Sequence, residues 1–115
     1  MLQKLDTQHL NRLALADALA NMKQSDFDMR IPRHCICGHA LRLFRKCWLH
    51  VGGWESQLRA GAEVLGLSIE QARDLFVPLN RAKMNDHYTH PQDAARVVRY
   101  LAATDTVDWA VAGRR

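Results

Sequence analysis

The stretch LRAGAEVLGLSIEQARDLF, residues 58–76, predicts two helices joined by a tight turn. Its apolar residues recur every three or four positions on both sides of Gly66, as on the buried face of a helix. Ser68 and Gln71 form the Ser-x-x-Gln pattern of a capping box, which starts the second helix. The residues predicted to face the core are Trp54, Leu58, Ala62 and Leu65 before the turn, and Ile69, Ala72, Leu75 and Phe76 after it.

This corner also has the outline of a DNA-binding helix-turn-helix over Ala62–Phe76. That motif needs a small residue, a turn glycine and apolar residues that lock two helices together, and Ala62, Gly66 and Leu75 occupy such places. The second helix would present to the major groove Ser68, Glu70, Gln71, Arg73 and Asp74. Two acids and one base are a poor face to set against phosphates. A plain αα-corner is therefore favoured, and the DNA-binding motif is the alternative.

The rest of the chain also has the periodicity of helices, which we expect at about 6–22, 37–51 and 91–103. The buried face predicted for 37–51 is Ala40, Leu43, Phe44, Cys47, Trp48 and Val51, and that for 91–103 is Ala94, Val97, Val98 and Leu101. Residues 89–92 have a second capping-box pattern, and Val107 and Trp109 are expected to pack back on the bundle. The sequence thus predicts an all-α fold, a compact bundle of about five helices.

The first helix, within residues 1–22, is apolar on more than one side. Leu10, Leu13 and Ala14 share one side, whereas Leu15 and Leu19 share another. A helix of this kind is deeply buried or contacts a partner. We therefore expect it to serve as a partner or dimer arm, and a homodimer through this helix is a secondary hypothesis.

The composition predicts one folded domain over residues 1–115. Hydrophobic residues make up 48% of the chain, and a chain of this length buries a core without disulfides. The three cysteines are an odd number and do not suggest a secreted disulfide framework. Neither a signal-peptide pattern nor an apolar run long enough for a membrane span is present, so we expect a cytoplasmic protein without a membrane partner.

The net charge of +4 is unevenly distributed along the chain. Residues 30–50 contain no Asp or Glu, and their basic side chains predict a positive surface that attracts an acidic protein surface or phosphate. The predicted binding surface consists of Arg30, Arg33, Arg42, Arg45 and Lys46. A solvated helix face is the competing interpretation.

All three cysteines, Cys35, Cys37 and Cys47, lie within 13 positions. Zinc needs four thiolate or imidazole ligands, but one Cys-x-Cys pair without a matching second pair is a weak signal. The favoured interpretation is therefore buried apolar cysteine, with no cofactor and no metal. If zinc were bound, in the third candidate function of a small zinc-stabilised domain, its ligands would be His34, Cys35, Cys37 and His39. A reactive thiolate at Cys37, near a helix start and with His34 or His39 as base, is the remaining alternative. Nothing else in the sequence has the pattern of an oxyanion hole, an orienting residue or a substrate pocket.

Several short motifs follow one another between Phe27 and Trp109, namely Phe27-Asp28-Met29, Cys35-Ile36-Cys37-Gly38-His39-Ala40, Leu65-Gly66-Leu67, Leu75-Phe76-x-Pro78, Gln92-x-Ala94-Ala95 and Val107-Asp108-Trp109. Their order and spacing resemble a family of small helical proteins of bacteria and phages. The resemblance implies a family-like core over 27–109 and a phage or mobile-element context, in which such proteins bind a host protein. It implies no activity, and the cysteine segment is shorter here than in that family.

These observations together favour a non-enzymatic binding or regulatory module that acts by protein–protein contact. No combination of residues in the sequence has the pattern of a catalytic site. The over-apolar first helix and the acid-free residues 30–50 are the candidate contact surfaces. The DNA-binding corner and the zinc-stabilised domain are the alternatives.

Overall fold

Five α-helices and two 3₁₀ helices make up the part of the chain that the computed structural model describes, residues 2–29, 34–44, 53–77 and 90–113. The α-helices are α1 (Leu2–Ala20), α2 (Ile36–Phe44), α3 (Trp54–Leu65), α4 (Ile69–Phe76) and α6 (Pro91–Thr104). The 3₁₀ helices are η1 (Gln24–Asp26) and η3 (Trp109–Gly113). These residues contain no strand, so the predicted all-α bundle of about five helices is confirmed.

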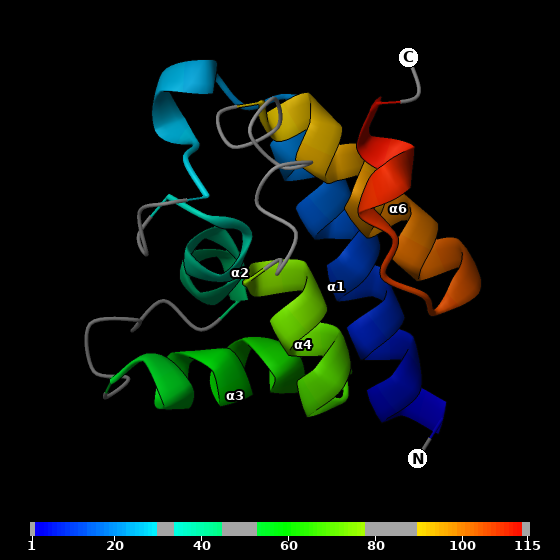
Figure 1. The fold of residues 1–115 in the computed structure, drawn as a ribbon. Coiled ribbons are helices and arrows are strands. Elements are labelled where there is room, and N and C mark those ends of the chain that lie inside the picture. The colour runs from blue at the N-terminus through cyan, green and yellow to red at the C-terminus, as the bar shows by residue number, and fades with distance from the viewer. Residues whose placement is uncertain (1, 30–33, 45–52, 78–89, 114–115) are drawn as a thin grey trace.

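The helices form two groups that share one core. α1 runs along α6, although these helices come from opposite ends of the chain (Figure 1). α2 and α4 each pack on α3, and α1 contacts both α2 and α3. The radius of gyration, 12.8 Å, is that expected for one compact domain of this length. α1 therefore joins the two halves of the bundle.

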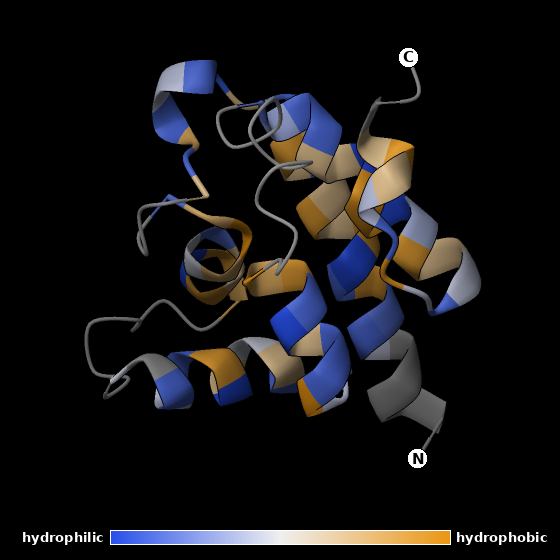
Figure 2. Ribbon diagram, in the orientation of Figure 1, coloured by the Kyte–Doolittle hydropathy of each residue, from blue (hydrophilic) through white to orange (hydrophobic). Residues whose placement is uncertain are grey.

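The core is built from one apolar face of each helix. Colouring by hydropathy shows these faces turned toward one another, with hydrophilic residues outside (Figure 2). Its largest fully buried aliphatic side chains are Leu15, Leu19, Ile36, Leu41, Leu65, Leu75, Val97, Val98 and Leu101. Each such burial contributes about 1.5–3 kcal/mol relative to exposure, so these contacts are the main favourable term in folding.

Two predicted core residues are exposed in the structure. In α2 the buried residues are Ile36, Cys37, Gly38, Ala40 and Leu41, whereas Leu43 is 44% exposed. Ala40 is buried as predicted and Phe44 is partly buried, so the core face is rotated by only a fraction of a turn, toward Leu41. The predicted members Cys47, Trp48 and Val51 lie outside the described residues. Ile69 is 39% exposed because it begins α4 between the exposed residues Ser68 and Glu70.

The predicted capping box at residues 89–92 is also wrong. His90 is the N-cap of α6 and Pro91 its first residue, and the His90 side chain forms no capping hydrogen bond. Thr89 lies outside the described residues. The Gln92 amide instead donates to two carbonyls at the end of α1, Ala20 O at 3.2 Å and Met22 O at 3.0 Å. Gln92 therefore satisfies acceptors that the end of α1 would otherwise leave without a partner.

The C-terminal residues pack against the bundle, as predicted. Val107 and Trp109 are half-buried against the core, and the Trp109 indole N–H donates to Asp74 O at 2.9 Å. Arg96 forms an ion pair with Asp93, which is 2% exposed, and donates to Ala112 O at 3.1 Å. η3 is thus attached to both α4 and α6.

Candidate functional site

The outward face of α1 carries two of the four large hydrophobic side chains that are exposed among the described residues. Leu10 is 61% exposed and Leu13 is 40% exposed, and Ala14 beside them is exposed as well. On the other side of the same helix Leu15 and Leu19 are completely buried. α1 therefore has two apolar sides, one in the core and one in water.

Only one residue of the predicted basic surface lies within the described residues. Arg42, in α2, is exposed, and its Nη2 lies 3.1 Å from His39 Nδ1. The other members, Arg30, Arg33, Arg45 and Lys46, fall outside the described residues. The structure thus describes one of the five cations, and the predicted surface stays a prediction.

His39 connects α2 with η1. Its Nε2 lies 2.8 Å from the Asp26 carbonyl, and Phe27 stacks on its ring with centroids 6.2 Å apart. Burial lowers the pKa of His39; the positive charge of Arg42 and the nearby His34 lower it further, while Asp26 acts in the opposite sense. A neutral imidazole is therefore the preferred state of this residue.

The two described cysteines, Cys35 and Cys37, are buried. Cys37 Sγ donates to Gln57 O at 3.4 Å, and burial raises the pKa of both Cys35 and Cys37. These thiols remain protonated at neutral pH and are poor nucleophiles, which agrees with the prediction that they are apolar core residues. Cys47 lies outside the described residues. Within the described ranges, no three His, Cys, Asp or Glu side chains are close enough together to hold a metal ion.

The corner between α3 and α4 has the local geometry that the sequence predicts. Gly66 ends α3 in the left-handed region, at φ 67°, and Ser68 and Gln71 form both hydrogen bonds of the capping box. The outward side of α4 carries Glu70 and Asp74 beside Arg73. Gln71, which the DNA-binding alternative places in the groove, is half-buried and donates to Asp105 O at 2.8 Å.

Polar side chains of α1 donate hydrogen bonds to the backbone carbonyls at the C-terminal end of α3. The side-chain amides of Gln8 and Asn11 donate to Glu63 O and Val64 O, and Arg12 Nε donates to Leu65 O at 2.7 Å. Arg12 Nη2 also donates to Gly66 O at 2.8 Å. The last carbonyls of a helix lack full partners within the helix, and α1 donates to four consecutive ones at the end of α3, of which Glu63 O also accepts from the Gly66 N–H.

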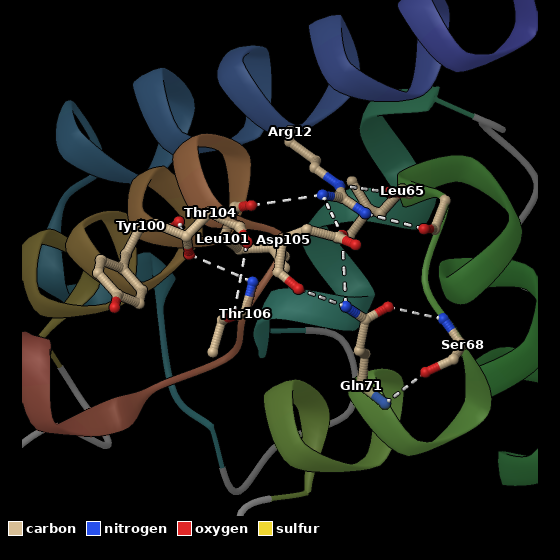
Figure 3. Close-up of polar contacts among 10 residues, drawn as sticks. Arg12, Leu65, Ser68, Gln71, Tyr100, Leu101, Thr104, Asp105 and Thr106 are labelled. Carbon is tan, nitrogen blue, oxygen red and sulfur yellow. Dashed lines mark hydrogen bonds and ion pairs between the residues drawn. The ribbon is translucent and has the colours of Figure 1, made fainter.

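Arg12 also joins α6 to this end of the bundle (Figure 3). Its Nη1 lies 3.3 Å from Leu101 O and 2.9 Å from the Asp105 carboxylate. Asp105 is the left-handed C-cap of α6, and it also accepts from Gln71 of α4. The hydrogen bond from Arg12 lowers the pKa of Asp105. One guanidinium, 8% exposed, thus links α1, α3 and α6, and Asp105 extends the link to α4.

Sequence reasoning missed Arg12, although its position carries a signal. Arg12 precedes Leu15 by three residues and Leu19 by seven, so it lies on the core face of α1. A charged residue on a core face needs polar partners, and the only nearby acceptors in an apolar bundle are the ends of helices. The carbonyls that it binds could not be identified without the packing.

No protein-family model, no curated protein and no solved structure matches this chain. The resemblance to the phage and bacterial family therefore rests on the short motifs alone. No described helix combines the length and hydropathy that crossing a membrane requires.

Proposed function

We propose that this chain is a non-enzymatic binding module that acts by protein–protein contact, and that the outward face of α1 is its principal contact surface. The exposed side chains of Leu10, Leu13 and Ala14 carry this proposal. Adjacent apolar residues on one helix face are the pattern by which a helix packs against a partner. In the mobile-element context that the resemblance implies, the partner is a host protein.

The partner surface that fits this face is an apolar helix or groove. Leu10 and Leu13 supply the apolar contact, and the exposed Asp17–Arg99 ion pair on the adjoining surface of α1 and α6 forms part of a polar rim. A small apolar centre with charged residues around it is the usual anatomy of a protein–protein contact. A second copy of this chain is the competing occupant.

The double variant Leu10→Glu/Leu13→Glu tests this proposal, because both residues are exposed and the core is left intact. A photo-crosslinking residue at position 14, which is exposed on the same face and unchanged in the double variant, should capture a discrete partner, and the same residue at position 69 should not. The double variant should abolish that capture, whereas Ile69→Glu, a comparably exposed apolar residue on α4, should leave it unchanged. Retention of the partner by the double variant would overturn the proposal.

Light scattering of the purified chain separates the two occupants. A dimer mass that returns to monomer in the double variant identifies a second copy, whereas a monomer at all concentrations leaves the heterologous partner.

The predicted basic surface has its own test. Loss of the partner on changing Arg42, Arg45 and Lys46 to Glu would include that surface in the contact, and an unchanged interaction would exclude it.

A DNA-binding function remains the second candidate, because the corner of α3 and α4 has a left-handed glycine and a complete capping box. The charges of the described residues oppose it. The ranges 2–29, 34–44, 53–77 and 90–113 contain 8 Lys and Arg but 11 Asp and Glu, so acidic residues outnumber basic ones there. The remainder of the chain contains 8 basic residues and 1 acidic residue. Random duplex DNA that binds at low salt with a steep salt dependence would support this function, and absence of binding would remove it.

A further inference from the structure

His39 has a contact on each of its two ring nitrogens. On one side Nε2 lies 2.8 Å from the backbone carbonyl of Asp26, at the end of η1. On the other side Nδ1 lies 3.1 Å from Arg42 Nη2, one turn further along α2. The ring therefore bridges a 3₁₀ turn and a helix that are separated in the sequence.

These two partners determine where the ring carries its proton. A guanidinium nitrogen offers only hydrogens, so Nδ1 must accept and carries none. A carbonyl oxygen can only accept, so Nε2 must carry the proton and donate it to Asp26. The two contacts therefore fit a neutral ring that carries its proton on Nε2.

The charged and titratable groups that face this ring are few. Arg42 approaches from α2, Asp26 from η1, and His34 from the turn before α2, its ring 6.3 Å from that of His39 in an edge orientation. Among the described residues, α1, α3 and α4 direct no ionisable group at the ring. Phe27, which is 2% exposed, covers one face of the ring with an interplanar angle of 16°.

We propose that His39 is a pH-sensitive contact, which holds η1 and Phe27 on α2 as the neutral ring and weakens when the ring takes up a second proton. The added proton sits on Nδ1, where it faces the hydrogens and the positive charge of Arg42. Arg42 thereby loses Nδ1 as an acceptor. The charged His39 ring remains next to Phe27, where it is partly shielded from water. Movement of η1 away from α2 hydrates that ring, so acid favours the open arrangement.

The direction follows from linkage. Burial lowers the pKa of His39 below its ordinary value of 6.5 in the closed arrangement, and exposure restores it in the open one. The open arrangement therefore binds more protons, and the closed one is favoured above pH 6.5 and weakened as the pH falls below it. The proposal is independent of the proposed function, because it concerns only the attachment of η1.

The test is an NMR titration of the full chain from about pH 8 to about pH 5, the range in which histidine titrates. Ring nitrogen shifts report the tautomer and midpoint of His39. Exchange protection of the Asp28 amide, which donates to His34 O at 3.0 Å, reports whether the segment after η1 stays against the start of α2. We expect the Nε2–H tautomer at high pH, a midpoint below 6.5, and loss of Asp28 protection as the ring titrates.

Two variants make the result specific. His39→Gln offers an amide that can meet both partners but does not titrate, so Asp28 protection should become independent of pH. Arg42→Ala should raise the midpoint of His39, whereas Arg59→Ala on α3 should not. An Nδ1–H tautomer, a midpoint at or above 6.5, or a pH dependence that persists in His39→Gln would each overturn the proposal. Should His39→Gln fail to fold, the tautomer and midpoint of the unaltered chain still decide it.

Discussion

Arg12 shows how a single charged side chain is accommodated in an apolar bundle. Its guanidinium lies among carbonyls at the ends of α3 and α6, which are the electronegative ends of those helices. The planar fork of donors can reach several acceptors at once, which a lysine ammonium cannot do in the same geometry. The residue therefore stabilises the junction of three helices through positions fixed by their backbones.

Replacing Arg12 should accordingly be costly. Arg12→Met keeps the aliphatic stem but leaves Leu65 O, Leu101 O and Gly66 O without this donor, so we expect a loss of about 3 kcal/mol in the free energy of unfolding. Arg12→Lys should lose nearly as much. Urea denaturation measures both, and Arg99→Met, which removes an exposed ion pair with Asp17, is the matched control, with an expected loss below about 1 kcal/mol.

Gly61 illustrates close packing at the same scale. A Cβ atom at this position would lie 2.8 Å from Phe76 Cε2 and 3.0 Å from Cys37 Sγ. Gly61→Ala should therefore lower the free energy of unfolding by about 1–2 kcal/mol, because overpacking outweighs the gain in helix propensity. Gly53→Ala, where nothing lies within 4 Å of the new atom, tests the same substitution without a clash and should cost less, about 0.5 kcal/mol, because alanine is a poorer N-cap than glycine. A Gly61→Ala protein as stable as the original would contradict the packing described here.

At the scale of elements, the corner of α3 and α4 was predictable because its determinants are local. The Ser68–Gln71 capping box and the turn at Gly66 depend on residues a few positions apart, and the structure contains both. Gln92 is the counterexample. Its local pattern predicted a cap of its own helix, yet the amide bonds to Ala20 and Met22, some 70 residues earlier. A sequence pattern cannot show which distant acceptor competes for a side chain.

The capping box gives a prediction for α4. Ser68→Ala removes the acceptor for the Gln71 backbone N–H, and with only eight residues the helix has few other hydrogen bonds to hold its first turn. We expect a loss of about 1 kcal/mol in the free energy of unfolding. Ser56→Ala, at an exposed position in the first turn of α3, should change it by less than about 0.5 kcal/mol. Equal effects of the two substitutions in denaturation would contradict a capping role.

For the whole molecule, helical content and the core were largely predictable because period and composition determine them. The rotation of α2 was not, since Leu41 and Leu43 are equally apolar and only the neighbouring helices decide which is buried. Some features of the candidate surfaces could be predicted from the sequence and others could not. The two apolar sides of α1 follow from the sequence, whereas the Arg12 junction depends on three helices meeting at one point.

The dependence of protein stability on pH should report the contact between Arg12 and Asp105. The Arg12 hydrogen bond lowers the pKa of Asp105, so the stabilisation is complete above the ordinary Asp value of 3.8 and is lost as the pH falls through the lower folded value. We therefore expect Asp105→Asn to have a lower melting temperature than the original at about pH 6, with the difference shrinking below pH 3.8. Calorimetry at several pH values measures this. A difference that does not change with pH, or that persists unchanged in an Arg12→Met background, would contradict the assignment.

The bonds of Arg12 also constrain how a newly made chain reaches its final form. Its acceptors lie 53 to 93 residues further along the sequence, on segments that leave the ribosome long after α1 does. Until then the leucines on both sides of the α1 segment lack the helices they pack against, and apolar surface exposed in this way is what chaperones bind. Closing such long loops slows folding, so we expect the bundle to form in one late step, after α6 has been synthesised.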